Sequence, residues 1–220
     1  MNNIIVLGCP RSGTSLVTNL VRSAGYNVDM DGTKQLMKPN PKYNPDGYYE
    51  RIDIVKLNDK LIKLINNQYS FLNPPCLTEI MRNTNIIEDI YSIEDELNYN
   101  NGWVVKDSRL IFTLNLYAFK HFKIIKVIRN KSNVKSSMIN HYGNLFEQDI
   151  EHGPHHIKQI NFDKYYDNIN ECLDWQIQPY EYTIVSYEDI LNYDTKNLDN
   201  FLENKVNKDL IKLNYVNYKM

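Results

Sequence analysis

The stretch Ile4-Ile5-Val6-Leu7-Gly8-Cys9-Pro10-Arg11-Ser12-Gly13-Thr14-Ser15-Leu16 decides the fold of this chain. Its first four residues are apolar and mostly β-branched, which predicts a buried strand. A short loop between Gly8 and Gly13 follows, and the apolar spacing of Leu16, Val17, Leu20 and Val21 predicts a helix. Backbone N–H groups and the positive end of a helix dipole converge where such a loop meets its helix, so we expect an anion site here.

The loop departs from the usual nucleotide-binding loop at one position. Gly8 and Gly13 have the spacing of the two glycines of a Walker A loop. The position of the Walker lysine holds Thr14, and the cation of the loop is Arg11. The loop therefore suits a phosphate-like group, but not the γ-phosphate of ATP held in the conventional way. A P-loop nucleotide kinase, which would need Lys at this position and Mg²⁺, remains an alternative.

Composition and charge limit the classes of protein to which this chain can belong. Its 220 residues, 42% hydrophobic and 24% charged, are typical of one soluble globular domain over 1–220. A net charge of −2 gives no global attraction to nucleic acid. The first strand starts close to Met1, and no apolar run approaches the ~18–20 residues of a membrane span. We therefore expect a cytoplasmic protein with no signal peptide, no membrane span and no nucleic-acid partner.

The three cysteines, Cys9, Cys76 and Cys172, are far apart and odd in number. They fit neither a disulfide framework nor a metal motif, so we expect reduced thiols. Cys9 lies in the anion loop, where we interpret it as a small buried residue.

Strands alternate with helical patterns along the rest of the chain. Strands are expected at 103–106, 124–128 and 182–185, loops at 30–48 and 142–162, and helices at 52–65, 86–97, 109–120, 134–139, 161–175 and 198–202. The helix over 86–97 alternates acidic and apolar residues, so we expect it to be solvated. The alternation of strands and helices predicts an α/β fold with a mostly parallel central sheet flanked by helices.

Charged residues follow the predicted strands where ligands usually bind. In open α/β sheets, ligand-facing residues cluster just past the carboxyl ends of the strands. Lys106, Asp107 and Arg109 follow one predicted strand, and Arg129 follows another. Ser137 lies two turns into the next helix, so we expect it and Arg129 to face the same edge as the first loop.

Two other groups of side chains have plainer interpretations. Lys131 and Lys135 are typical of a solvated helix face. His152, His155 and His156 fit no zinc pattern and indicate a surface loop, with a lid over the substrate as the alternative.

Three segments together strongly resemble the sulfotransferases that use 3′-phosphoadenosine 5′-phosphosulfate (PAPS). They are 10–16, 127–129 with Ser137 eight residues on, and Tyr187-Glu188-Asp189. The resemblance covers roughly residues 3 to 205 and is greatest to the microbial branch, whose loop reads P-R-S-G-T-S. Two more segments fit that branch, Asn44-Pro45-Asp46-Gly47-Tyr48-Tyr49-Glu50 and Val105-Lys106-Asp107-Ser108-Arg109-Leu110. The resemblance implies a single sulfotransferase domain with a three-layer, P-loop NTPase-like fold.

The resemblance also implies how the donor is held, without a metal. The 5′-phosphate would bind the loop of Pro10, Arg11, Ser12, Gly13, Thr14 and Ser15, through the N–H groups from Ser12 to Ser15 and the three hydroxyls. Arg11 matches the cation that stabilises the leaving phosphate during sulfuryl transfer. Arg129 and Ser137 match the pair that binds the 3′-phosphate, and Tyr187 matches a tyrosine near the adenine.

Transfer to a hydroxyl, or to an amine, needs a general base for the acceptor proton. The histidine that the cytosolic branch uses is missing after Lys106. Glu50 matches the glutamate of the carbohydrate and microbial branches, so it is the leading candidate, although an acidic residue in a first helical turn is also ordinary dipole compensation. Asp107 and His141 are the alternatives. Lys106 matches a lysine that stabilises the leaving group or the acceptor.

The acceptor-facing residues are expected in the loops 30–50 and 142–162. Both are rich in Tyr, Asn and His, which suits a small-molecule or carbohydrate-like hydroxyl. A non-catalytic homologue that binds a nucleotide without transfer is a further alternative. The sequence indicates no oligomeric state.

Overall fold

The computed structural model describes residues 2–42, 44–66, 84–142 and 162–211. Its centre is a four-stranded parallel sheet in the order β2-β1-β3-β4. The strands are β1 (Asn3–Leu7), β2 (Val104–Lys106), β3 (Phe122–Ile128) and β4 (Tyr182–Ser186). Because every pair is parallel, the segments that follow the four strands all start from the same edge of the sheet.

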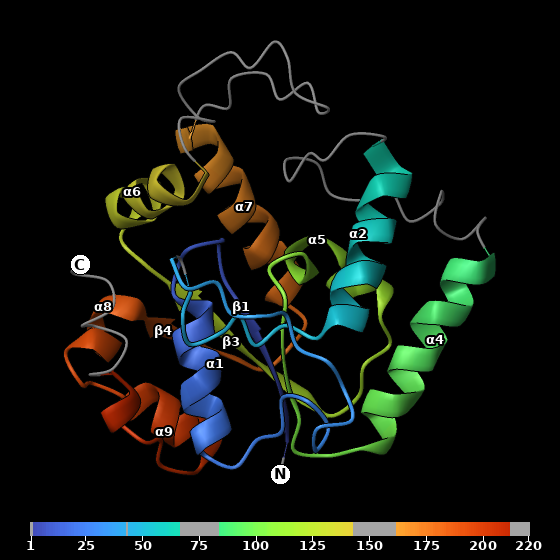
Figure 1. Ribbon diagram of the computed structural model, residues 1–220, viewed down its shortest axis with the longest axis horizontal. Helices are drawn as coiled ribbons and strands as arrows, with labels where there is room; N and C mark the ends of the chain where they lie inside the picture. Colours follow the sequence, from blue (N-terminus) through green and yellow to red (C-terminus); the bar gives the residue numbers. More distant parts are fainter. Residues whose placement is uncertain (1, 43, 67–83, 143–161, 212–220) are drawn as a thin grey trace.

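Helices cover both faces of this sheet. Figure 1 shows α1 (Thr14–Ser23), α8 (Tyr187–Leu191) and α9 (Lys196–Leu202) on one side. The other side carries α2 (Ile52–Asn66), α4 (Thr84–Tyr99), α5 (Leu110–Thr113) and α7 (Phe162–Ile177). A 3-10 helix, η1 (Leu114–Leu116), follows α5, and α6 (Lys131–Tyr142) follows β3.

The alternation of side chains along β1 produces two separate cores. Ile5 and Leu7 pack into one core with residues of α2, α4, α5 and α7, whereas Ile4 and Val6 pack into another with residues of α1, α8 and α9. All four side chains are fully buried, as expected for a central strand covered on both faces. The predicted α/β fold with a parallel sheet between two helical layers is confirmed.

Helix α4 is present where the sequence predicts a helix, but the expectation that it is solvated is wrong for one of its faces. Ile86, Ile90, Ile93 and Leu97 recur at helical spacing and are all buried in the core beside α2. The helix is amphipathic: these apolar residues share one face, and the acidic residues between them lie on the other faces.

The helix predicted over 109–120 ends early. α5 has four residues and η1 reaches only Leu116, after which Tyr117 is extended with φ −105° and ψ 134°. The Tyr117 ring stacks on Phe119 at 4.7 Å, and its hydroxyl donates a hydrogen bond to Asn58 Oδ1 at 2.8 Å. These tertiary contacts outweigh the helical pattern of the segment.

Other expectations have mixed outcomes. Cys9 is buried as expected, and Cys172, on α7, is half-buried. Cys76 and the three histidines His152, His155 and His156 lie outside the described residues. Within the described ranges, no helix is both long and apolar enough to cross a membrane.

Candidate active site

The loop between β1 and α1 is held in a conformation that requires glycine at one position. Gly13, the N-cap of α1, has a φ of 95°, in the left-handed region. A Cβ atom there would lie 2.1 Å from Cδ2 of Tyr187, so the tyrosine ring occupies the space that a side chain would need. Arg11 also has a positive φ, of 70°. The Ser12 N–H donates to the Cys9 carbonyl at 2.9 Å, so it is already used within the loop.

The structure brings together the residues predicted to bind the two ends of the donor. Arg11 Nε donates a hydrogen bond to Ser137 Oγ at 3.1 Å. Arg129 Nη1 donates to the Arg11 carbonyl at 2.9 Å, and its guanidinium carbon lies 4.5 Å from the centre of the Tyr187 ring. Four residues that follow three neighbouring strands therefore meet at one edge of the sheet.

Two buried polar atoms at this place fit an anionic ligand. Ser12 Oγ and Arg129 Nε are buried and have no hydrogen-bond partner among the described residues. Buried polar groups are nearly always paired in native proteins, so an unpaired hydroxyl and an unpaired guanidinium N–H point to a missing ligand or water. The N–H groups of the first turn of α1, which begins two residues after Ser12, have no partner within the helix. The site thus offers donors and positive charge together.

Cys9 adds no negative charge to this loop. Burial raises the pKa of its thiol to about 12, so the thiol is neutral at physiological pH. The prediction of a small buried residue at this position is confirmed.

Ser15 contacts the segment that leads to α2. Its Oγ accepts a hydrogen bond from Asn44 Nδ2 at 3.1 Å and lies 3.5 Å from the Tyr48 carbonyl. The Met37 N–H donates to the Glu50 carbonyl at 2.8 Å, which holds the same segment from its other side. These contacts place the segment that leads to α2, including Glu50, beside the loop between β1 and α1.

Glu50 and Lys106 form a buried ion pair. Lys106 Nζ donates to Glu50 Oε1, and the two side chains are only 7% and 9% exposed. Lys106 ends β2, and Glu50 lies two residues before α2, so the fold joins positions 56 residues apart. The sequence predicted a catalytic role for each residue but not their pairing.

Asp107, one of the alternative bases, is already engaged in a buried network. One of its oxygens accepts from Asn58 Nδ2 at 2.9 Å, and the other accepts from the Arg109 N–H and Nη1 at 3.0 and 2.8 Å. Its side chain is 1% exposed. Arg109 Nε also donates to Asp59 at 2.6 Å. Asp107 therefore ties the end of β2 to α2.

His141, the other alternative base, lies one helical turn beyond Ser137 on α6 and is half-buried. Burial and the positive charge of Arg11 lower its pKa. Its imidazole is thus biased toward the neutral form, which can accept a proton. Both lysines of α6 contact α7: Lys131 pairs with Asp163 and Asp167. Lys135 Nζ lies 5.8 Å from the centre of the Phe162 ring.

Sequence reasoning missed three residues that hold this site: Asn44, Asn58 and Glu188. Asn44 and Glu188 lie inside segments that carried the family resemblance. The resemblance marked these segments as part of the site, but it did not predict the contacts of the two side chains. Asn58 gave no signal, because an Asn on an amphipathic helix is common.

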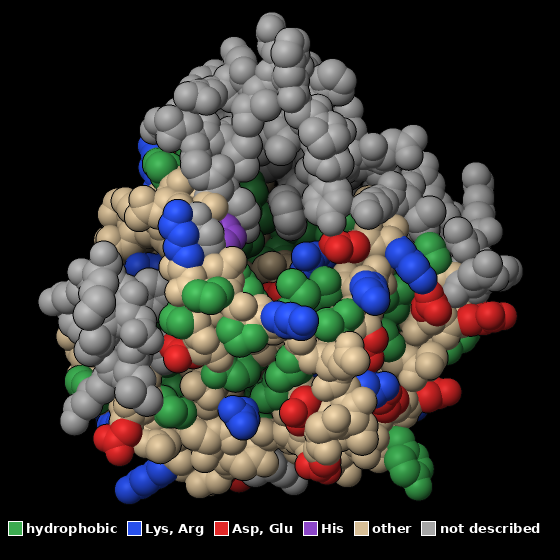
Figure 2. All heavy atoms as spheres, in the orientation of Figure 1, with side chains coloured by type: hydrophobic (Ala, Val, Ile, Leu, Met, Phe, Trp, Pro, Cys, Tyr) green, Lys and Arg blue, Asp and Glu red, His purple; other side chains and the backbone are tan. Residues whose placement is uncertain are grey.

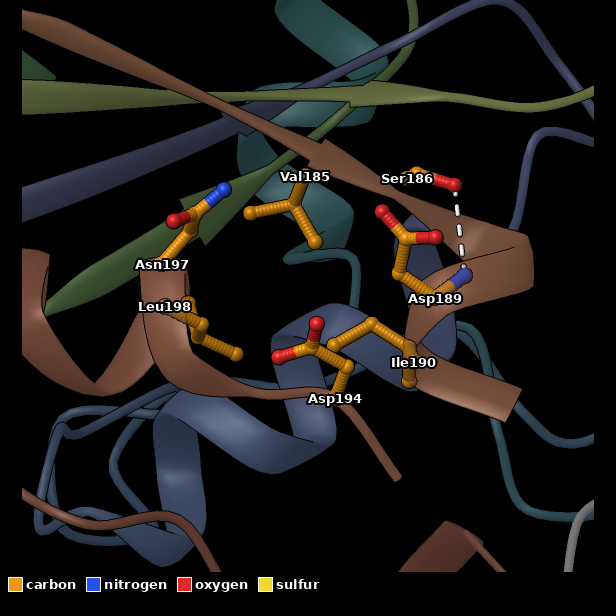
Figure 3. Close-up of a pocket in the computed structure, with 7 residues that line it drawn as sticks. All are labelled: Val185, Ser186, Asp189, Ile190, Asp194, Asn197 and Leu198. Atoms are coloured by element: carbon orange, nitrogen blue, oxygen red, sulfur yellow. Dashed lines mark hydrogen bonds between the residues drawn. The ribbon is translucent and has the colours of Figure 1, made fainter. Parts of the chain in front are cut away.

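A small cavity lies on the α8 side of the sheet. Figure 3 shows it between β4, α8 and α9, lined by Ser186, Asp189, Asp194 and Asn197 among others. Its volume of about 20 Å³ is enough for roughly one water molecule. On the face seen in Figure 2, charged side chains of both signs gather around a separate hollow near the middle of the view.

The sequence of the chain matches a known protein family. The family model described as "Sulfotransferase domain" matches residues 1–216. The chain is similar in fold to the sulfotransferase domain from the curacin biosynthetic pathway, with 15% identity, a TM-score of 0.45, and 91% of this chain and 72% of that chain covered. It is also similar to retinol dehydratase in complex with androsterone and inactive cofactor PAP, with 15% identity, a TM-score of 0.39, and 96% and 62% covered.

No curated protein matches the chain significantly. The match to the family model nevertheless covers nearly all of the 220 residues. The chain therefore belongs to the sulfotransferase domain family and is a sulfotransferase.

Proposed function

We propose that this chain transfers a sulfuryl group from PAPS to a hydroxyl, or an amine, of a small-molecule or carbohydrate-like acceptor. The observation that carries the proposal is the meeting of Arg11, Ser137 and Arg129 at the ends of β1 and β3. An ordinary ATP site needs one cluster of cations around a triphosphate. Here a second cation, Arg129, lies beside the loop, which supports our proposal of a nucleotide that carries a second anionic group.

When bound, PAPS would supply the sulfuryl group and take back, on its 5′-phosphate, the electron pair of the sulfur–oxygen bond that breaks. Thr14, Ser15 and the rest of the loop from Pro10 to Gly13 would hold the 5′-phosphate. Arg129 and Ser137 would hold the 3′-phosphate. Tyr187 would lie near the adenine, as in related enzymes, while its ring also packs on Arg129.

Arg11 would stabilise the negative charge that develops on the leaving phosphate. Its guanidinium already lies at the loop, fixed by the bond from Nε to Ser137 Oγ. A preorganised cation at the place where charge develops lowers the barrier without reorganising during the reaction, and such effects are worth ~3–4 kcal/mol per donor.

Glu50 would take the proton of the acceptor, and Lys106 would hold the Glu50 carboxylate in position. The ammonium group offsets the charge of a carboxylate that is buried, and it holds one carboxylate oxygen in place. Loss of one partner from such a pair leaves the other charge buried and uncompensated. A hydroxyl bound beside the second oxygen of Glu50 would give up its proton as its oxygen attacks sulfur, opposite the phosphate that leaves.

The segment 30–50 supports a polar acceptor. It is joined to the nucleotide loop through Ser15 and Asn44, so an acceptor that touches it would also lie near the sulfuryl group. Residues 143–161 of the second expected acceptor loop lie outside the described residues, and we propose the same role for them.

Two measurements test the proposal. 3′-Phosphoadenosine 5′-phosphate (PAP) should raise the melting temperature, because a ligand that binds only the folded state stabilises it by RT ln(1 + [L]/Kd). Transfer of radiolabelled sulfate from PAPS should then be found with at least one member of a panel of sugars, phenols and amines. Stronger stabilisation by ATP with Mg²⁺ would favour the kinase alternative, and PAP binding without any transfer would favour a non-catalytic homologue.

A further inference from the structure

Glu188, in the first turn of α8, contacts the N-terminus of α6. Its Oε1 accepts hydrogen bonds from the Asn130 N–H at 3.1 Å and from Asn133 Nδ2 at 3.2 Å. The register of β3 and β4 pairs Ile128 with Ser186. Glu188 and Asn130 each lie two residues beyond that pair, so the parallel register places them next to each other.

Helix α6 has no acidic residue in its own first turn. Its first residue, Lys131, is paired with Asp163 and Asp167 of α7, which offset the charge of the lysine. A negative charge near a helix N-terminus stabilises the helix. Glu188 supplies such a charge from α8 and accepts directly from the Asn130 N–H, in a solvent-exposed contact.

Tyr187, the residue before Glu188, contacts Arg129, the residue before Asn130. The Tyr187 ring lies under the guanidinium of Arg129, 4.5 Å from its central carbon. Tyr187 and Glu188 thus fix two consecutive residues after β3, the side chain of Arg129 and the backbone of Asn130. Arg129 and, farther along α6, Ser137 are the two groups assigned to the 3′-phosphate.

We propose that Glu188 is a positioning residue that sets the specificity of the site for nucleotides with a 3′-phosphate. It would do so by holding the start of α6, and with it Arg129 and Ser137, in the arrangement that binds the phosphate. A site that is ordered before binding loses less entropy on binding, so its affinity is higher. The inference rests on the proposed function, since it assumes that the nucleotide carries a 3′-phosphate.

The test measures dissociation constants for PAP and for adenosine 5′-phosphate, which lacks the 3′-phosphate, by calorimetry. Glu188→Ala should weaken PAP about two- to fivefold, the range expected when a helix N-terminus loses one solvent-exposed carboxylate, and should leave the affinity for adenosine 5′-phosphate unchanged. Asp189→Ala is the matched control. It removes the same charge from the next residue, whose N–H donates to Ser186 Oγ and would remain. It should leave both affinities unchanged.

Glu188→Gln provides a second variant that keeps an oxygen acceptor for the Asn130 N–H. It should recover part of the PAP affinity, because the acceptor is kept and the charge is lost, and it should fold like the wild type, as checked by circular dichroism and melting temperature. Equal weakening of both nucleotides in Glu188→Ala would show a merely structural role and overturn the inference. Unchanged or tighter PAP binding in that variant would overturn it as well. A wild-type chain that fails to bind PAP would instead overturn the proposed function, and this inference with it.

Discussion

Arg11 Nε donates a hydrogen bond to Ser137 Oγ at 3.1 Å, across 126 residues of sequence. The bond joins the loop after β1 to the second turn of α6, and so joins the residue assigned to the leaving phosphate with one assigned to the 3′-phosphate. The two ends of the proposed donor site are therefore one connected structure.

Ser137→Ala should weaken PAP about tenfold, since one hydrogen bond to a charged group is lost, while the affinity for adenosine 5′-phosphate should change little. The control is Ser136→Ala, because the Ser136 hydroxyl is exposed and donates only to the Ser132 carbonyl of its own helix. Calorimetric titration of both variants with both nucleotides checks this. If Ser137→Ala lowered both affinities to the same extent, the assignment to the 3′-phosphate would be wrong.

Glu50→Gln should retain PAP binding but lose at least ~10²-fold in turnover, the usual contribution of a general base. It should also lose stability by about 3–5 kcal/mol, because Lys106 would remain buried without its partner. The double variant Glu50→Gln/Lys106→Met separates these effects: it should recover stability in urea unfolding but not turnover. Turnover like that of the wild type in Glu50→Gln would move the base to another residue, with His141 as the next candidate.

Gly13→Ala should destabilise the fold by about 2–5 kcal/mol, since it adds the cost of a left-handed backbone to a collision with the Tyr187 ring. Gly32→Ala is a matched control, because Gly32 also has a positive φ, of 80°, but nothing lies within 4 Å of its added Cβ. It should lose only the backbone contribution, ~1–2 kcal/mol. Chemical denaturation of both variants provides the comparison, and equal losses would contradict the close packing of Tyr187 on the loop.

His141→Asn should reduce the loss of stability in mild acid. Burial and Arg11 lower the pKa of His141 in the folded state below its usual value of 6.5. The unfolded chain therefore takes up a proton before the folded chain does, so stability is unaffected above pH 6.5 and falls as the pH drops below it. Melting temperatures between pH 5 and 8 should show a shallower acid slope for the variant, and an unchanged slope would refute the shift.

Cys9 should resist alkylation in the native protein. Its thiol has a pKa of about 12 and is almost fully buried, so very little thiolate is present at pH 8. Cys172, half-buried on α7, serves as the internal comparison and should react faster. Treatment with iodoacetamide followed by peptide mass spectrometry checks this, and rapid native modification of Cys9 would show that the loop opens.

The local pattern of the sequence was enough to locate most elements. Runs of β-branched and other apolar residues marked all four strands, and the helical period marked α1, α2 and α7, because these signals depend only on neighbouring residues. The same local reading failed for the helix expected through 120, where contacts from Asn58 and Phe119 decide the conformation of Tyr117. It also failed to show that one face of α4 is buried.

By itself, the sequence determined the anion loop, its missing Walker lysine and the family that these features indicate. Loop chemistry is local: Gly13, Arg11 and the start of α1 are adjacent in the chain. Only the tertiary structure decided which charges pair. Glu50 meets Lys106, and Glu188 meets Asn130, because parallel strands bring the ends of distant segments to one edge of the sheet. Burial then strengthens the Glu50–Lys106 pair, and burial cannot be read from neighbouring residues alone.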